Sequence, residues 1–232
     1  MRKIAIIPAR GGSKRIPRKN IKDFYGKPII SYSIEAAIKS QSFDEVMVST
    51  DDKEIAEISK KYGASVPFFR TVELSDDSAA TLPVLLEVLD EYLKRNKDFT
   101  HGCCIYPCTP LITSEMIKMG MELLVTHLMD TVIPVIKFSY PPQRGISINN
   151  GLIQVLYPEV SCIRTQDMEP IYRDAGQFYC FSIDSIRKQR TLFCRRSMPI
   201  VLSELEVQDI DNADDWDLAK IKYSLKNPIK QC

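Results

Sequence analysis

Apolar runs of strand length alternate along the chain with segments whose apolar residues recur at helical spacing. The runs expected to form buried strands are residues 3–9, 45–50, 102–107 and 131–138. The segments expected to form helices are residues 30–40, 51–63, 81–96 and 113–127. A short continuous apolar run indicates a strand covered on both faces, whereas apolar residues three and four apart indicate a helix that buries one face. The alternation therefore predicts an α/β fold with a doubly wound, mainly parallel sheet.

Polar residues that start or stop helices flank two of the predicted helical segments. Asp51 or Asp52 is expected to begin the second helix, and Gly63 is expected to end it. Thr113 or Ser114 is expected to cap the fourth helix, because a side-chain oxygen at that position accepts a hydrogen bond from a free amide of the first turn.

The pattern changes between residues 139 and 174. There the run GISINNGLIQVLYPE reads as two short strands around Asn150 and Gly151, which is a typical β-hairpin signal. A returning core strand at 176–183, a short helix at 184–190, an extended run at 199–206 and a final helix from about residue 211 are expected after it. We expect one domain over residues 1–232, with an embedded arm at about 139–174.

Composition narrows the class of protein. The chain has 31 Lys plus Arg against 30 Asp plus Glu, so a nucleic-acid partner, which would call for a basic excess, is not expected. No apolar run approaches the roughly 20 residues that span a bilayer, and the short apolar start is unlike a signal peptide. Seven cysteines, an odd number without metal-ligand pairing, favour a reducing, cytoplasmic location.

The first predicted strand runs into a basic loop that contains glycine. Its sequence, PARGGSKRIPRKN, carries the cations Arg10, Lys14, Arg15, Arg18 and Lys19. Ligands of open α/β sheets bind beyond the carboxyl ends of the strands. Gly11 and Gly12 allow close approach of the backbone to an anion, and Ser13 offers a hydroxyl. Arg10 and Lys19 can make charge-assisted hydrogen bonds to phosphate oxygens.

A solvated basic turn is the alternative interpretation of this loop. The loop fits neither the Walker pattern nor the dinucleotide fingerprint, because Lys14 is followed by Arg15 and only Gly11 and Gly12 are present. A local site for a polyphosphate is the interpretation that the position after a buried strand favours.

The same loop resembles the N-terminal signature of the cytidylyltransferases that activate nine-carbon acidic sugars, the CMP-sialic acid synthetase family. The resemblance covers almost the whole chain and implies a Rossmann-like nucleotidyltransferase fold. In that family the loop wraps the phosphates of CTP. The implied nucleotide contacts are Arg10, Gly11, Gly12, Ser13, Lys14, Lys19 and Asn20. Arg10 and Lys19 are expected to face the triphosphate and to be catalytic.

Two carboxylates, Asp209 and Asp211, lie two residues apart near the other end of the chain. In an extended segment their side chains would project on one side. Mg²⁺ prefers oxygen ligands and is usually held by one or two carboxylates together with substrate phosphates. The alternative is that the pair caps the last helix, with Asp211 as N-cap. The segment QDIDN matches the family's Mg²⁺-binding segment, so the resemblance implies Mg²⁺ held by Asp209 and Asp211, with Asp211 also catalytic.

Base recognition is expected from two further segments. FFRTVELSDDSAAT could be an ordinary capping loop, but it is similar to the family's segment beside the cytosine. The implied contacts are Arg70, Ser78, Ala79 and Ala80. YPCTPL looks like a proline-containing turn of the family and implies a contact from Thr109, which Cys108 precedes here.

A carboxylate acceptor requires a cation in the sugar pocket. The candidates for sugar binding, taken from SYPPQRG, RTQD and YRDAGQFY, are Gln143, Arg144, Arg164, Gln166, Arg173, Gln177 and Tyr179. A core strand and an arm would explain the apolar members of these segments equally well. The segments are most similar to the branch of the family that acts on pseudaminic acid. The family also implies a homodimer in which the arm reaches the neighbouring subunit.

The expected reaction is attack of the sugar's anomeric hydroxyl on the α-phosphorus of CTP, with release of pyrophosphate. Sialic acid and legionaminic acid are alternative acceptors. An NAD-dependent dehydrogenase is disfavoured by the glycine spacing, and a non-catalytic nucleotide sensor is disfavoured by Asp209 and Asp211. The proton acceptor stays open between Asp211, a water that it holds and a metal-bound hydroxide. His101 and His127 are expected to be structural or surface residues.

Overall fold

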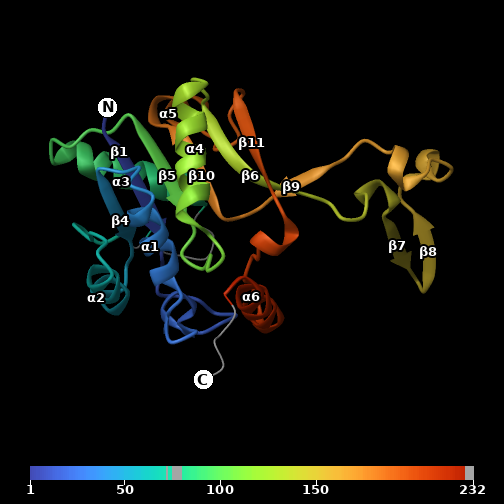
Figure 1. Cartoon of the computed structure of the whole chain (residues 1–232), viewed down its shortest axis with the longest axis horizontal. Coiled ribbons are helices and arrows are strands. Elements are labelled where there is room, and N and C mark those ends of the chain that lie inside the picture. Colours follow the sequence, from blue (N-terminus) through green and yellow to red (C-terminus); the bar gives the residue numbers. More distant parts are fainter. Residues whose placement is uncertain (72, 75–79, 228–232) are drawn as a thin grey trace.

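The computed structural model of the protein describes residues 1–71, 73–74 and 80–227, and a mixed, mostly parallel sheet forms its centre (Figure 1). Its strands are β1 (Lys3–Pro8), β4 (Glu45–Ser49), β5 (His101–Ile105), β6 (Thr131–Lys137), β9 (Tyr172–Asp174), β10 (Phe178–Ser182) and β11 (Ser197–Leu202). The order is β11-β6-β10-β5-β1-β4, and β9 pairs with β6. β1 runs parallel to β4 and β5, and β11 parallel to β6, while β10 is antiparallel to both neighbours. The predicted fold class is confirmed.

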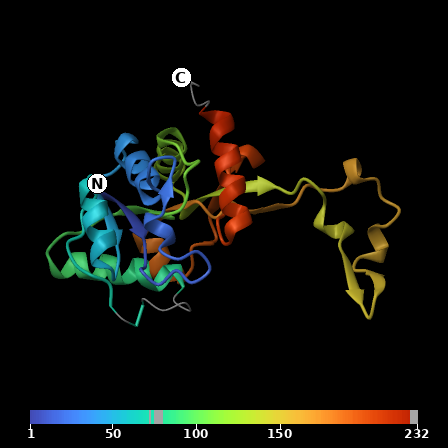
Figure 2. The same ribbon diagram turned by 90° about the horizontal axis from the view of Figure 1, so that it is seen from below.

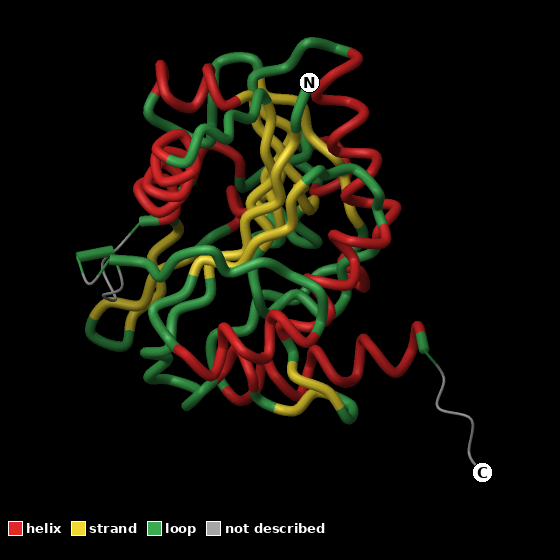
Figure 3. The backbone as a smooth tube through the Cα atoms, turned by 90° about the vertical axis from the view of Figure 1, so that its left-hand side faces the viewer, coloured by secondary structure: helices red, strands yellow, loops and turns green. Residues whose placement is uncertain are grey.

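Helices cover both faces of the sheet (Figure 3). They are α1 (Ile30–Lys39), α2 (Lys53–Lys61), α3 (Thr81–Lys94), α4 (Ser114–Thr126) and α5 (Ile183–Gln189). Ala5 and Ile7 of β1 belong to the core formed with α1, α2 and α4. Ile4 and Ile6 belong to a second core, formed with α3 and α5. Because side chains alternate across a strand, one buried strand supplies both layers.

Helix starts follow the capping residues that the sequence offers. Asp52 caps α2 by accepting a hydrogen bond from the amide of Ile55 at 2.9 Å. Thr113 caps α4 by accepting from Met116 at 3.3 Å. The last helix, α6 (Ala213–Lys226), is capped by Asn212 in a reciprocal capping box, so Asp211 is not its N-cap. No helix in the described ranges combines the length and the apolar character needed to cross a bilayer.

A third, smaller core joins the beginning of the chain to α6. The short strands β2 (Asp23–Phe24) and β3 (Lys27–Pro28) form a hairpin just after the basic loop. The Phe24 ring meets the Trp216 ring edge-on, with centroids 5.5 Å apart, and Ile16 and Ile210 are buried in the same cluster. This packing holds α6 beside the basic loop (Figures 1 and 2).

The arm projects from the body beyond β6 and β9 (Figures 1 and 2). Its hairpin pairs β7 (Ile146–Asn149) with β8 (Leu152–Val155). Asn150 and Gly151 both have positive φ, 49° and 79°, as a two-residue turn between right-twisted strands requires. The predicted hairpin is confirmed. Short 3₁₀ turns at Pro142–Arg144, Pro158–Val160 and Thr165–Asp167 make up the rest of the arm's regular structure.

Candidate functional site

Hydrogen bonds from buried side chains hold the basic loop after β1 in place. The buried amide of Asn20, in the 3₁₀ turn Lys19–Ile21, donates a hydrogen bond to the carbonyl oxygen of Arg10 at 2.8 Å. The thiol of Cys108 lies 3.2 Å from the Asn20 side-chain oxygen and donates to it. Burial raises the pKa of this thiol to about 12, so it stays protonated and able to donate. Cys108, in the turn after β5, therefore supports the loop.

Close packing on α2 accounts for one glycine of the loop. The amide of Gly11 donates to a carboxylate oxygen of Asp51 at 2.9 Å. A Cβ at Gly11 would lie 2.8 Å from a carboxylate oxygen of Asp52, inside van der Waals contact. Nothing lies within 4 Å of a Cβ at Gly12. A side chain is therefore excluded by packing at Gly11, whereas there is space for one at Gly12.

Arg18 and Arg15 of the loop pair with acids that lie far apart in the chain. Arg18 forms ion pairs with Asp52 and Glu54 at the start of α2. Its hydrogen bond is the main cause that holds the pKa of Asp52 below the ordinary value. Arg15 reaches the other way and pairs with Asp211 at 2.9 Å. Arg18 therefore positions the loop on α2, and Arg15 ties it to the C-terminal acids.

Lys19 connects the two ends of the chain more closely. Its Nζ donates a hydrogen bond to the carbonyl oxygen of Ile210 at 2.6 Å and lies 4.0 Å from a carboxylate oxygen of Asp211. Asp209, Asp211 and Arg15 line one pocket, and Lys19 lines the adjacent pocket with Arg10 and Ser13. The cations from the beginning of the chain and the acids from near its end therefore meet in one region.

Asp209 is placed where a cation would be favoured. Desolvation, followed by repulsion from Asp211, raises the pKa of Asp209 above its ordinary value, and Lys19 opposes the shift. A bound divalent cation reverses such a shift, because it favours both ionised carboxylates. No group of three or more His, Cys, Asp or Glu side chains suited to a metal occurs in the described ranges. Two carboxylates fit Mg²⁺, whose remaining ligands come from phosphates and water.

The pocket beneath the basic loop brings several predicted nucleotide contacts together. It is lined by Pro8, Arg10, Ser13, Lys19, Asn20, Arg70, Thr81, Val84, Tyr106 and Pro107. Arg70 is buried, and its guanidinium donates to the hydroxyl of Ser49 at 3.1 Å and to the Ser49 carbonyl at 2.6 Å. Burial lowers the pKa of Arg70 from its ordinary value. The site is thus a cationic pocket at the carboxyl ends of β1 and β5.

The remaining base-side candidates are placed differently. Ala80 is exposed and precedes α3, whose first turn has no side-chain cap at that residue. Ser78 and Ala79 lie outside the described residues. Thr109 is buried, and its hydroxyl bonds the Tyr106 carbonyl at 2.9 Å and lies 3.0 Å from the Ser33 hydroxyl. The side chain of Thr109 therefore holds the turn after β5 in place.

The sugar-side candidates divide into two groups. Tyr179 lies beside the pocket under the basic loop, where its hydroxyl donates to Asp174 and its ring meets Tyr106 edge-on at 5.7 Å. Arg173 pairs with Glu204 at 3.2 Å. The other group, Gln143, Arg144, Arg164 and Gln166, lies on the arm, away from this pocket in the same chain (Figure 1).

Two of these candidates have structural contacts. Gln177 is fully buried, and its side-chain nitrogen donates to the carbonyl oxygen of Glu206 at 3.0 Å. Arg144 donates to the carbonyl oxygens of Ser161 and Ile163, which closes the arm on itself.

Sequence reasoning missed Tyr106, Thr81, Phe193 and Arg15. The hydroxyls of Thr81 and Tyr106 lie 3.0 Å apart. Both residues line the pocket beneath the basic loop, and both also line a second pocket that contains Tyr179 and Phe193. The position of Tyr106, at the carboxyl end of a buried strand, was a signal that could have found it. No pattern in the sequence places Phe193 near Tyr179.

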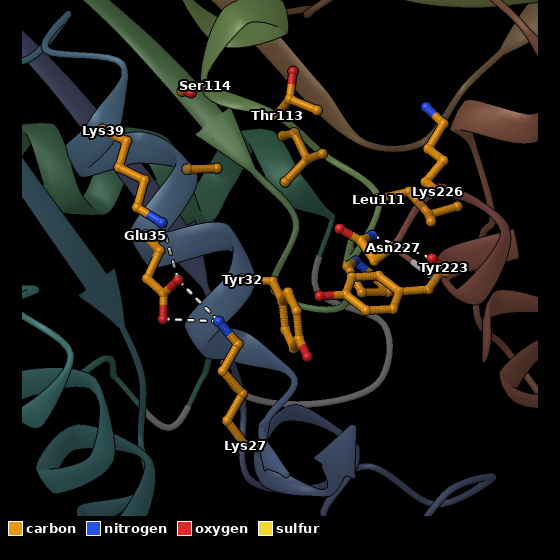
Figure 4. A pocket seen from close by; sticks show the side chains of 13 residues that line it. Lys27, Tyr32, Glu35, Lys39, Leu111, Thr113, Ser114, Tyr223, Lys226 and Asn227 are labelled. Carbon is orange, nitrogen blue, oxygen red and sulfur yellow. Dashed lines mark hydrogen bonds and ion pairs between the residues drawn. The ribbon is translucent and has the colours of Figure 1, made fainter. Parts of the chain in front are cut away.

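A separate pocket lies between α1, the loop before α4 and α6 (Figure 4). Its Lys27 and Lys39 both point toward Glu35, with N–O distances of 2.8 and 3.5 Å (Figure 4). None of the predicted site residues lines this pocket. Glu35 pairs with both of these cations, whereas the pocket under the loop contains the predicted phosphate contacts Arg10, Ser13 and Lys19 at the carboxyl end of a buried strand. The pocket under the loop is therefore the better site for a polyphosphate.

Comparison with known proteins identifies the family. The family model described as Cytidylyltransferase matches residues 4–139, which include the basic loop, Arg70 and Thr109.

The chain belongs to the cytidylyltransferase family.

A pseudaminic acid cytidylyltransferase of Campylobacter jejuni is 40% identical over 228 residues, which cover 98% of this cytidylyltransferase and 98% of the relative. A CMP-N,N'-diacetyllegionaminic acid synthase of Legionella pneumophila is 33% identical over 230 residues, covering 95% of each chain. The expected class of enzyme, a nucleotidyltransferase, is confirmed by this family membership.

Solved structures agree on the fold. A CMP:2-keto-3-deoxy-manno-octonic acid synthetase in complex with CTP superposes with a TM-score of 0.70 at 16% identity, covering 99% of this chain and 100% of the other. A 4-diphosphocytidyl-2C-methyl-D-erythritol synthase of Anaerococcus prevotii superposes with a TM-score of 0.64 at 13% identity, covering 96% and 98%. At these identities the likeness concerns the fold, which is that of the nucleotidyltransferases.

Proposed function

We propose that this cytidylyltransferase joins CTP to a nine-carbon sugar acid, with pseudaminic acid as the acceptor, and releases pyrophosphate. The observation that carries the proposal is the contact of Lys19, which lines the nucleotide pocket, with Ile210 and Asp211 beside that pocket. That arrangement gives cations for phosphates and carboxylates for a metal in one place. The choice of acceptor is supported by the 40% identity to the pseudaminic acid enzyme over nearly the whole chain.

The nucleotide end of the site follows from the pocket under the basic loop. Arg10 and Lys19, which line the pocket, and the backbone amide of Gly12 bind the triphosphate, because charged donors and close amides suit phosphate oxygens. The Gly11 amide instead donates to Asp51. Buried Arg70 presents its guanidinium to the same pocket. The backbone around Ala80 is assigned to the base, together with Ser78 and Ala79, which lie outside the described residues. Lys14 is assigned to the phosphates with the rest of the loop.

Asp209 and Asp211 hold Mg²⁺ in this proposal. When bound, Mg²⁺ neutralises charge on the phosphates and on the departing pyrophosphate, which is worth several kcal/mol to such a transfer. Lys19 and Arg15 hold the acids close to the loop, so that the phosphates and the carboxylates can share one cation. The residues of the chain thereby fix the α-phosphorus in position for in-line attack by the anomeric hydroxyl.

The acceptor occupies the side of the site formed by Tyr106, Tyr179 and Phe193. Aromatic walls suit the acyl and methyl groups of such sugars, and the neighbouring Arg173 offers a cation to the sugar carboxylate. Gln177 is assigned to the sugar side indirectly, because it holds the Glu206 carbonyl and with it the segment that leads to Asp209.

The arm acts in a homodimer in this proposal. Its exposed apolar residues include Tyr140, Ile146, Ile148, Leu152, Ile153, Val155, Leu156, Tyr157 and Ile163. Apolar surface gathered on a projecting element favours contact with another chain. Gln143, Arg144, Arg164 and Gln166 would then be carried toward the sugar side of the neighbouring subunit.

The decisive experiment incubates the protein with CTP and Mg²⁺ and adds pseudaminic, legionaminic or sialic acid in separate reactions. Pyrophosphate release and the mass of the CMP-sugar are followed. Turnover with pseudaminic acid at a kcat/KM at least tenfold above the other acids is expected. Preference for another acid would overturn the acceptor, and CTP binding without pyrophosphate release from any acid would favour a nucleotide sensor. Omission of Mg²⁺ with added chelator tests the metal.

A further inference from the structure

Helix α6 carries a buried lysine, Lys222, which is 6% exposed. Its Nζ donates a hydrogen bond to the carbonyl oxygen of Val207 at 2.8 Å and lies 3.8 Å from a carboxylate oxygen of Glu204. Lysine is almost never fully buried unless it is paired, because its ammonium group loses hydration. An apolar residue would fill this place in the helix at lower cost. The contact with Val207 therefore calls for an explanation.

The chain from Val207 to Asp211 belongs to no helix or strand. Its position depends on side chains from three other parts of the chain, which bind carbonyls of the segment or of Glu206 just before it. Gln177 donates to the carbonyl of Glu206, Lys222 to that of Val207 and Lys19 to that of Ile210. Val207 and Ile210 are buried. Asp209 and Asp211 line the pocket that also contains Arg15. Carbonyls buried without a ladder need donors of this kind.

We propose that Lys222 is a positioning residue, which fixes the extended segment Val207–Asp211 so that Asp209 and Asp211 face, in one register, the pocket that adjoins the nucleotide pocket. The proposal rests on the metal role of the two aspartates given above. Lys222 touches neither the substrates nor the metal. It acts two residues before Asp209, through the Val207 carbonyl, whereas Lys19 binds the Ile210 carbonyl one residue after Asp209.

Removal of the donor without loss of volume tests the proposal. Lys222→Met keeps an unbranched side chain of similar length, and Lys222→Arg keeps a charged donor. Lys220→Met, two residues away on α6, is the matched control, because the Lys220 side chain makes no hydrogen bond or ion pair described for the resolved ranges. The first measurement is hydrogen exchange of the amides from 207 to 211 in the ligand-free protein. The second is Mn²⁺ binding in the presence of CTP, followed by the loss of the free-ion electron paramagnetic resonance signal.

Lys222→Met is expected to speed exchange at 207–211 and to weaken Mn²⁺ binding about tenfold, since a hydrogen bond from a charged group is worth roughly that factor or more. CTP binding without metal is expected to stay within about twofold, because the basic loop is untouched. Lys222→Arg should restore Mn²⁺ binding to within about threefold of the wild type. Lys220→Met should change neither measurement.

Unchanged exchange and unchanged Mn²⁺ affinity in Lys222→Met, with only a lower melting temperature, would overturn the proposal and leave Lys222 a structural residue. Should Lys222→Met not fold, Lys222→Leu, which also lacks a hydrogen-bond donor, takes its place with the same expectations. Failure of the wild-type protein to bind Mn²⁺ or CTP would instead overturn the proposed function. The exchange measurement needs neither ligand, so it still decides whether Lys222 fixes the segment.

Discussion

Lys19 donates a 2.6 Å hydrogen bond to the carbonyl oxygen of Ile210, a residue 191 positions further along the chain. The contact places a cation of the basic loop against the backbone between Asp209 and Asp211. One side chain therefore serves two parts of the proposed site. It contributes charge to the nucleotide pocket, and it sets how far the acidic segment stands from that pocket.

Lys19→Met should raise the Michaelis constant for CTP by about tenfold to a hundredfold, because charge-assisted hydrogen bonds contribute roughly 1.5–3 kcal/mol. The constant for the sugar acid should change much less. Steady-state kinetics with each substrate varied in turn measure both. Lys60→Met, at an exposed position of α2, is the control and should behave as wild type. Equal effects on the two substrates would contradict the assignment of Lys19 to the triphosphate.

Asp209→Asn should lower kcat by at least about a hundredfold and yet stabilise the metal-free protein at neutral pH. The pKa of Asp209 is raised in the folded state, so the folded protein binds this proton more tightly than the unfolded chain does. Ionisation of Asp209 thus costs stability, and that cost develops as pH rises through the unfolded and then the folded pKa. Neutral asparagine avoids it.

Thermal melts from pH 4 to pH 8, without divalent cations, measure this effect. The wild type should lose stability relative to Asp209→Asn as pH rises. Addition of Mg²⁺ and CTP should restore the stability of the wild type and should not stabilise the variant. Asp214→Asn, at the exposed start of α6, is the matched control. A variant that is less stable than the wild type at pH 8 would argue against a raised pKa of Asp209, whose causes are desolvation and then repulsion from Asp211.

Gly11→Ala and Gly12→Ala should differ sharply although the residues are adjacent. A Cβ at Gly11 meets Asp52, which cannot easily withdraw because Arg18 and the amide of Ile55 hold it. A destabilisation of about 1–3 kcal/mol is expected, as for other overpacked sites, whereas Gly12→Ala should stay within about 0.5 kcal/mol. Urea unfolding of the ligand-free variants compares them. Similar unfolding midpoints would show that the loop moves away from α2 freely.

Phe193→Ala should raise the Michaelis constant for the sugar acid about tenfold and leave that for CTP within about twofold. The ring of Phe193 meets the ring of Tyr179 edge-on, with centroids 6.4 Å apart. Phe193 lines the pocket next to the nucleotide site. Loss of a large apolar contact removes about 1–3 kcal/mol of binding to a matching group. Phe69→Ala, an exposed phenylalanine outside this pocket, is the control. A larger effect on CTP than on the acid would place the base, not the sugar, against Phe193.

Ile148→Asp combined with Leu152→Asp should shift the protein from dimer to monomer. The two side chains are 71% and 74% exposed on the hairpin of the arm, and a carboxylate on each would have to be desolvated in an apolar interface. Light scattering coupled to size exclusion gives the mass. Leu128→Asp, equally exposed at 74% but outside the arm, should stay dimeric. A monomeric wild type would contradict the proposed homodimer.

Local patterns in the sequence were sufficient to predict most elements of the fold. The apolar runs 3–9 and 102–107 became β1 and β5, and the Asn150-Gly151 signal became the turn of the hairpin. These features depend on neighbours within a few residues, namely side-chain periodicity and positive φ at a turn. The returning strand before Ile183 was also foreseen, but its antiparallel direction between β5 and β6 depends on partners far along the chain.

The sequence by itself determined the chemistry of the site: a basic, glycine-containing loop after a buried strand and a pair of carboxylates near the other end. Which residues serve that chemistry directly was decided by the tertiary structure. Arg18 turns to Asp52, Thr109 turns into the core, and Lys222 reaches the Val207 carbonyl. The reason is physical: charge and hydrogen-bonding capacity are written in each residue, but the partner that satisfies them is whichever group packing brings within about 3 Å.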